Sequence, residues 1–174
     1  RSALREPRVR VALAIVVPVV AALLQGTLGP LMDLGGVRPN MPILVAASWS
    51  VAAGAGEGLW WAFVGGLAAD LLSGGPLGAF TVSSLPGALA VGLGERSLAR
   101  PVPVVAGAAA VGLAALVAAL LYAGVLALVG HPLAAPAVLA LQTVGSALYT
   151  AALALVVYPL ARVGRRLTET ESPF

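Results

Sequence analysis

The chain has 174 residues, of which 60% are hydrophobic and only 10% are charged, and its mean hydropathy is +1.00. A soluble domain carries roughly 25% charged residues, so this composition excludes a soluble enzyme and a disordered tail. The net charge is only +3, without the clustered basic face that a nucleic-acid-binding module needs. We therefore predict an all-α integral membrane protein that contacts lipid and binds no nucleic acid.

Six apolar stretches approach the length of about 20 residues that a helix needs to cross a bilayer. The first begins with Arg-rich sequence, as a signal peptide does, but its apolar run is too long for one and no convincing cleavage site follows. We therefore expect it to be retained. The predicted spans form a single transmembrane domain over residues 1–174: 9–28, 41–55, 58–73, 78–95, 102–129 and 133–161.

Glycine and proline mark the divisions between these spans. Gly54-Ala55-Gly56-Glu57-Gly58 separates the second from the third, and Pro86-Gly87 is expected to kink the fourth. Residues 101–161 contain no Asp, Glu, Lys or Arg. As one helix this stretch would be about 90 Å long, three times the bilayer core, so it must fold back. Gly130-His131-Pro132 is the strong breaker near its middle.

The arginines provide a separate test of the number of spans. With a cytoplasmic N-terminus and six crossings, nine of the ten Arg lie in the cytoplasm and only Arg38 lies outside. Merging the second and third spans would place the C-terminal Arg cluster outside. Six spans therefore place both termini in the cytoplasm. The missing Lys and the abundance of Ala, Gly and Arg suggest a bacterial gene, so the expected location is the bacterial cytoplasmic membrane.

Aromatic and small residues suggest further details of the bundle. Trp60, Trp61 and Tyr158 fall near predicted cytoplasmic helix ends, where aromatic side chains form a belt at the membrane surface. Small residues that recur four apart allow close approach of helices, although such pairs also arise by chance in a chain this rich in Ala and Gly. The pairs are Gly54/Gly58, Ala88/Gly92 and Ala108/Gly112.

The residues that enzymes use are scarce. The chain has no Cys and a single His, His131, so the usual zinc ligand sets cannot form. The Gly-rich segments lack the pattern of a phosphate-binding loop. His131 is expected to be a polar residue of an outer turn. We predict no catalytic residue, no metal site and no cofactor.

Asp70 requires an explanation because a carboxylate inside a span costs up to about 3 kcal/mol. One interpretation is structural, with Asp70 accepting hydrogen bonds from Ser73 and the free N–H groups of the following turn. The other is functional, as a proton or ion site or a contact with a partner. We favour the structural interpretation, because the span has no cationic neighbour. Asp70 and His131 are both expected near the outer face, so they could pair.

Polar side chains cluster on three of the predicted spans. They either form interhelical hydrogen bonds or line a groove for a small ligand or a partner's helix, and we favour the first for any single residue. The residues concerned are Ser48, Trp49, Ser50, Thr81, Ser83, Ser84, Gln142, Ser146, Tyr149 and Thr150. Of these, Trp49, Gln142, Ser146 and Tyr149 are candidate contacts of a groove or a partner.

The segment from Arg38 to Leu98 resembles the rod shape-determining protein MreD family. Its recurring run is Gly-Leu-x-x-Asp-x-x-Ser-Gly-x-Pro-Leu-Gly, and Ala68-Ala69 replaces the bulkier aliphatic residues usual there. The matching positions are Gly66, Asp70, Ser73, Gly74, Pro76, Leu77 and Gly78. The close match covers about 60 residues, and the rest agrees in length and number of spans.

The resemblance implies a fold similar to the S components of energy-coupling-factor transporters. It also implies a non-catalytic subunit of the elongasome, which builds the lateral peptidoglycan wall and maintains rod shape. The expected direct partner is MreC, through its single transmembrane helix. RodA, its penicillin-binding transpeptidase and MreB are expected as indirect partners. The alternative is an S-component-like transporter subunit that binds a vitamin, although the predicted outer loops are short and their polar residues few.

Overall fold

The computed structural model describes residues 5–96 and 102–169, which fold into six α-helices and no strand. The helices are α1 (Arg5–Leu28), α2 (Met41–Ala53), α3 (Ala55–Ser73), α4 (Ala79–Arg96), α5 (Val104–Leu128) and α6 (Pro136–Glu169). An isolated β-bridge joins Leu34 and Val37 in the connection between α1 and α2. The all-helical expectation is confirmed for these residues.

Local sequence explains where several helices begin and end. The Asn40 Oδ1 accepts a hydrogen bond from the Ile43 N–H at 3.2 Å, and Pro42 occupies the first turn of α2. Gly54 alone separates α2 from α3, with φ of 95° that a side chain would disfavour. Gly74, in the left-handed conformation, ends α3. The break that the sequence placed at residues 54–58 is therefore a single residue.

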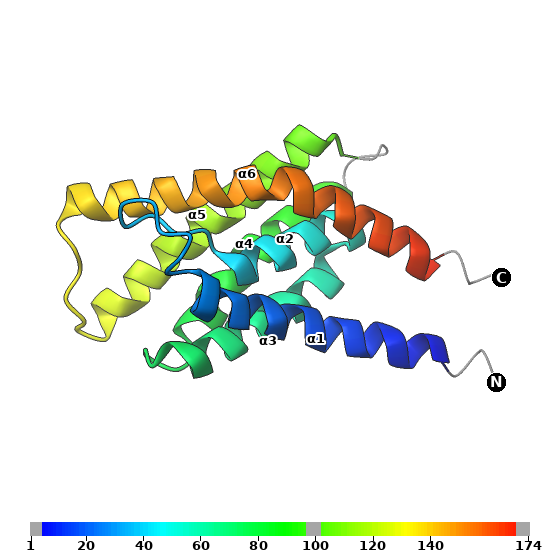
Figure 1. Ribbon diagram of the computed structural model, residues 1–174, viewed down its shortest axis with the longest axis horizontal. Helices are drawn as coiled ribbons and strands as arrows, with labels where there is room; N and C mark the ends of the chain where they lie inside the picture. The colour runs from blue at the N-terminus through cyan, green and yellow to red at the C-terminus, as the bar shows by residue number, and fades with distance from the viewer. Residues whose placement is uncertain (1–4, 97–101, 170–174) are drawn as a thin grey trace.

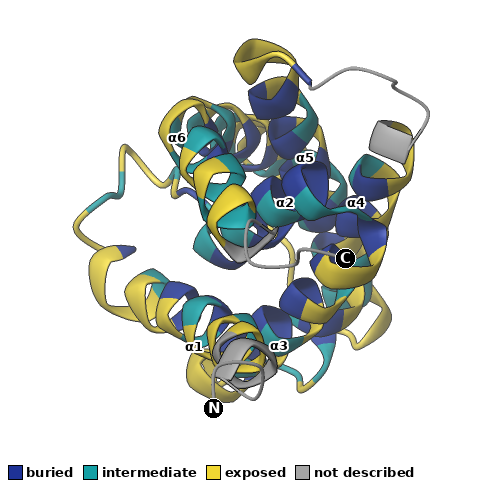
Figure 2. Cartoon of the chain, turned by 90° about the vertical axis from the view of Figure 1, so that its right-hand side faces the viewer, coloured by how far each residue is buried: buried dark blue, intermediate teal, exposed yellow. Residues whose placement is uncertain are grey.

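The helices run back and forth along the bundle, and the beginning of α1 and the end of α6 lie at one end of it (Figure 1). The connections after α1 and α5 lie at the opposite end. Seen along the bundle, α2 lies towards the middle, with α1 and α3 on one side and α5 and α6 on the other (Figure 2). It packs against all five other helices, and nine of its 13 residues are buried. This short helix is therefore the centre of the fold.

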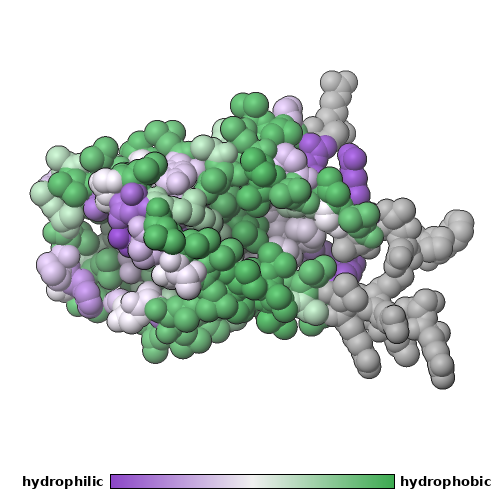
Figure 3. All heavy atoms as spheres, in the orientation of Figure 1, coloured by the Kyte–Doolittle hydropathy of each residue, from purple (hydrophilic) through white to green (hydrophobic). Residues whose placement is uncertain are grey.

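The outer surface is that of a membrane protein. Large aliphatic side chains stand exposed along the bundle, and hydrophobic atoms cover most of the face seen in Figure 3, with polar atoms gathered towards its two ends. Three helices are long and apolar enough to cross a membrane within the described residues: Arg10–Leu28, Val104–Leu128 and Pro136–Leu167. Met41–Ala53 and Ala79–Gly94 are shorter apolar helices. Burying this surface in lipid removes it from water.

The last helix is longer than the sequence indicated, since α6 continues to Glu169 instead of ending near residue 161. Two arginines in the added turns bind backbone carbonyls of neighbouring segments. Arg162 donates to the Val102 carbonyl at 3.3 Å, and Arg165 donates to the Ala52 carbonyl at the end of α2. The Arg165 cation suits the C-terminus of α2, and both contacts help to hold the extension against the bundle.

Two of the three predicted belt residues are instead part of the packed interior. Trp61 is 5% exposed and stacks on Trp49 with ring centroids 4.4 Å apart. Tyr158 is 1% exposed and donates to the Val102 carbonyl at 3.1 Å. Trp60, by contrast, is 50% exposed, as a belt residue requires. Hydropathy could not separate these residues, because Trp60 and Trp61 lie at the same depth on different faces of α3.

In each of the small pairs, one glycine could not carry a side chain without a clash. A Cβ on Gly58 would lie 2.3 Å from the Ser50 side chain, and one on Gly92 would lie 2.5 Å from the Ala55 Cα. A Cβ on Gly112 would lie 2.7 Å from the Ala151 Cβ. Gly54 has open space around it and serves the helix break instead.

Candidate functional site

Asp70 joins the end of α3 to the beginning of α4. Its side chain is 1% exposed, and Oδ1 accepts the Phe80 N–H at 2.8 Å. Oδ2 accepts the Thr81 N–H at 3.1 Å and the Thr81 hydroxyl at 2.6 Å. These backbone donors belong to the first turn of α4, where no helical carbonyl can reach them. Asp70 therefore caps α4 from a neighbouring helix, and the negative charge also suits the helix N-terminus.

The structural interpretation of Asp70 is thus supported, but its expected donors were wrong. The carboxylate binds groups ten and eleven residues away, not those of the turn at 73–78. Ser73 instead donates to the Asp70 backbone carbonyl at 3.3 Å and accepts the Gly75 N–H at 3.3 Å. The turn reverses the chain so that α4 begins beside Asp70.

The other residues of the motif allow this arrangement. Gly74 and Gly78 have φ of 65° and 90°, which glycine adopts without strain. A Cβ on Gly66 would lie 2.6 Å from the Thr81 Cα, so its absence lets α3 and α4 touch. The Pro76 carbonyl accepts the Ala79 N–H at 3.2 Å, while Leu77 is 75% exposed. These motif positions therefore shape the α3–α4 hairpin.

Hydrogen bonds between helices account for several of the polar residues in the spans. Ser84 on α4 donates to the Ala62 carbonyl of α3 at 3.2 Å, and Ser50 on α2 donates to the Ala88 carbonyl of α4 at 2.6 Å. Ser48 is fully buried, but its hydroxyl has no partner among the described residues. The sequence expectation of interhelical hydrogen bonds thus holds for Ser50 and Ser84.

The proposed pairing of Asp70 with His131 is not observed. His131 is exposed in the connection between α5 and α6, and no hydrogen bond or ion pair joins the two side chains in the described part of the chain. Both Asp70 oxygens already accept hydrogen bonds.

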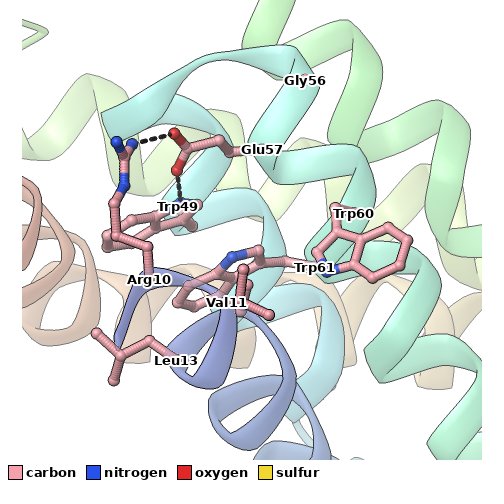
Figure 4. Close-up of a pocket in the computed structure, with 9 residues that line it drawn as sticks. Arg10, Val11, Leu13, Trp49, Gly56, Glu57, Trp60 and Trp61 are labelled. Atoms are coloured by element: carbon pink, nitrogen blue, oxygen red, sulfur yellow. Dashed lines mark hydrogen bonds and ion pairs between the residues drawn. The ribbon is translucent and has the colours of Figure 1, made fainter. Parts of the chain in front are cut away.

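A second cluster lies at the end of the bundle where the chain termini lie. Glu57 Oε1 binds Arg10 at 2.8 Å, and Glu57 Oε2 accepts the Trp49 indole N–H at 2.9 Å (Figure 4). Trp60 and Trp61 line the same pocket, an apolar hollow of about 330 Å³ between α1 and α3. The sequence singled out Trp49 as a groove contact, but could not predict its stacking on Trp61 or its bond to Glu57. No local pattern in the sequence indicates that bond, because Trp49 and Glu57 lie on either side of the helix break at Gly54.

A larger cavity, of about 500 Å³, lies at the other end of the bundle. Ser83 of α4, Tyr122 of α5, and Gln142 and Ser146 of α6 line it, together with residues of both connections. Tyr149 does not line it. Thr150 is fully buried, accepts the Asn40 N–H at 3.0 Å and donates to the Ser146 carbonyl. The predicted polar face of α6 therefore has two roles: Gln142 and Ser146 line this cavity, and Thr150 binds the Asn40 backbone.

The connection between α1 and α2 is ordered by an ion pair beside this cavity. Asp33 binds Arg38 at 2.7 Å and accepts the Gly36 N–H. The Arg38 guanidinium, more than the Gly36 N–H, holds the pKa of the Asp33 carboxyl below its usual range. Gln25 accepts the Met41 N–H at 2.7 Å and anchors the far end of the connection. The sequence suggested only a polar loop here.

No cluster of His, Cys, Asp or Glu able to hold a metal ion exists among the described residues. The carboxylates whose side chains are described are Asp33, Glu57 and Asp70, and each is bound to a donor of the chain itself.

Comparison with known protein families gives a match to most of the chain. The family described as rod shape-determining protein MreD matches residues 8–163, which is most of the chain. No curated protein and no solved structure matches.

Proposed function

The chain belongs to the rod shape-determining MreD family, and from this premise we propose that it is a non-catalytic subunit of the machinery that elongates the bacterial cell wall. The family match itself places the chain in rod shape determination. That match over residues 8–163 is the observation that carries the proposal. More specifically, we propose that the chain is a membrane scaffold that binds the single transmembrane helix of MreC. Through MreC it would associate indirectly with RodA, its transpeptidase and MreB.

Membrane insertion is proposed as six crossings with both termini in the cytoplasm. The charge distribution of the described residues supports this orientation. Arg10, Arg162 and Arg165 lie at the end of the bundle that carries the chain termini, whereas the Arg38–Asp33 pair lies at the other. Cationic residues concentrate on the cytoplasmic side of membrane proteins. The first end would therefore face the cytoplasm.

A scaffold role agrees with how the chain uses its polar groups. The buried carboxylate of Asp70 accepts hydrogen bonds that cap α4, and the Glu57 carboxylate binds Arg10 and Trp49. Much of the remaining surface is aliphatic and exposed. A partner's apolar helix can pack on such a surface through van der Waals contacts.

The test is co-purification with the cognate MreC. The affinity-tagged chain is co-expressed with MreC, extracted in mild detergent and reconstituted in nanodiscs. We expect MreC to be retained in stoichiometric amount. The matched control is MreC whose transmembrane helix is replaced by an unrelated apolar helix of the same length, and we expect its retention to fall at least tenfold. Equal retention of both forms would contradict binding through the span, and loss of both would contradict the partnership.

A further inference from the structure

The cavity at the loop end of the bundle owes its volume to small side chains. Three alanines of α5, Ala118, Ala119 and Ala123, form its wall where larger residues would fill the space between α4 and α6. The connections after α1 and α5 contribute the rest, with Gly36 and Leu133 among the lining residues. The resulting space of about 500 Å³ falls in the range of small-molecule sites.

Hydrogen-bonding groups that the fold leaves unused face this space. Within the described residues, the side chains of Tyr122, Gln142 and Ser146 all line the cavity and make no hydrogen bond. Ser146 and Gln142 of α6 offer a hydroxyl and an amide. The Tyr122 hydroxyl on α5 lies at the edge of the cavity next to the α3–α4 turn, since a Cβ on Gly75 would lie 3.6 Å from it. The backbone of the α1–α2 connection passes close to the amide, since a Cβ on Gly36 would lie 3.5 Å from the Gln142 Nε2. Polar groups that converge in this way, without serving the fold, are typical of a binding site.

The electrostatics of the cavity favour an uncharged occupant. Its two charged side chains, Arg38 and Asp33, neutralise each other through contacts of 2.8 and 2.7 Å. An ionic ligand would therefore lose its hydration without gaining an uncompensated partner charge. A neutral ligand incurs no such cost.

The apolar part of the lining favours a ring. Phe80 and Tyr122 pack with ring centroids 4.4 Å apart and a tilt of 31°, and both line the cavity. Leu126 and Leu139 add aliphatic surface. Such a wall offers a planar group both contact area and favourable ring–ring geometry.

We propose that this cavity binds a neutral small molecule that carries a ring together with amide or hydroxyl groups. Gln142, Tyr122 and Ser146 hydrogen-bond its polar groups, and the ring lies against Phe80 and Tyr122. At roughly 30 Å³ per non-hydrogen atom the space holds about 17 such atoms. This inference concerns a small-molecule site and does not depend on the proposed binding of MreC.

The first test uses three probes that share an indole ring and differ in charge. They are indole-3-acetamide, which is neutral, indole-3-acetate, which is anionic, and tryptamine, which is cationic, and all three carry the ring on a two-carbon side chain of nearly the same size. Binding to the full chain in nanodiscs is measured by saturation-transfer NMR and equilibrium dialysis. We expect the neutral probe to bind at least about tenfold more tightly than either charged one, because the cavity offers no unpaired charge to a charged ligand. Equal binding of the three, or no binding of the neutral probe at millimolar concentration, would overturn the proposal.

The second test changes the cavity itself. Ala119→Leu narrows it, and Ala127→Leu adds the same side chain at an exposed position of α5 that does not line the cavity. We expect the first to weaken binding of the neutral probe at least fivefold and the second to leave it unchanged. Gln142→Leu retains the volume and removes the amide, so we expect about a fivefold loss. All variants are first checked for unchanged thermal melting. If Ala119→Leu does not fold, the affinity of Gln142→Leu for the neutral probe alone tests the proposal. Equal affinity of Gln142→Leu and the parent would contradict the assigned hydrogen bond.

Discussion

At Asp70 three hydrogen-bond donors converge on a carboxylate that is 1% exposed. Leucine in its place would leave the Phe80 and Thr81 N–H groups and the Thr81 hydroxyl without an acceptor. Each buried unsatisfied group costs about 1–3 kcal/mol, so we expect Asp70→Leu to lower the free energy of unfolding by at least 3 kcal/mol. Asp70→Asn keeps one oxygen and should lose about half as much. Steric trapping or SDS titration of the reconstituted chain measures these differences.

A suitable control for Asp70 is Ser73→Ala, since Ser73 makes only bonds of 3.3 Å on the exposed turn. We expect it to cost less than about 1 kcal/mol. Unfolding of Asp70→Leu at the same denaturant concentration as the parent would show that the cap contributes nothing. In that case the motif aspartate would need a role outside the fold.

The hydrogen-bond partners of individual side chains were the features least predictable from the sequence. The position of Asp70 inside an apolar span predicted a cap, because a buried carboxylate needs donors. Which donors it binds depended on how the turn at 73–78 folds back, and no local pattern encodes that. The same holds for Glu57, whose partners Arg10 and Trp49 lie on two other helices. A groove lined by polar residues of these spans was one of the alternatives that the sequence left open. The sequence could not show which residues line it, since Ser83, Tyr122 and Gln142 come together only when α4, α5 and α6 pack.

Close packing between helices can be tested at Gly92 on α4. A Cβ there would lie 2.4 Å from the Ser50 Oγ and 2.5 Å from the Ala55 Cα, so the α2–α3 junction would have to move. We expect Gly92→Ala to destabilise the fold by about 1–3 kcal/mol through overpacking, measured by SDS titration. Gly94→Ala is the matched control, because nothing lies within 4 Å of that position and alanine favours a helix by up to about 1 kcal/mol. If the two variants unfold alike, α2 and α4 do not pack as closely as described.

Helices themselves were largely predictable, since apolar runs and the Gly and Pro that interrupt them are local signals. The predicted spans 41–55 and 102–129 correspond to Met41–Ala53 and Val104–Leu128. The C-terminal end of α6 was the exception, because the prediction ended with the apolar run. The helix continues where Arg162 and Arg165 bind carbonyls of other segments, which hydropathy does not register.

At the scale of the whole molecule, the proposed threading makes a prediction that the absence of Cys makes easy to test. Single cysteines at exposed residues report which side of the membrane each end of the bundle faces. Leu34→Cys, Leu77→Cys and His131→Cys lie in the connections after α1, α3 and α5, and Leu167→Cys lies near the end of α6. With six crossings and cytoplasmic termini, a membrane-impermeant maleimide should label the first three in intact cells. It should label Leu167→Cys only after the cells are permeabilised.

Each other labelling pattern identifies a different error in the threading. Labelling of Leu167→Cys alone would mean that the orientation is inverted and that the Arg-rich end does not face the cytoplasm. Labelling of Leu34→Cys without Leu77→Cys would mean that α2 and α3 do not each cross the bilayer. That outcome is the most informative, because α2 has 13 residues and is about 20 Å long, well short of the roughly 30 Å hydrocarbon core. Its full crossing requires the surrounding helices, all five of which contact it, to shield its ends from lipid.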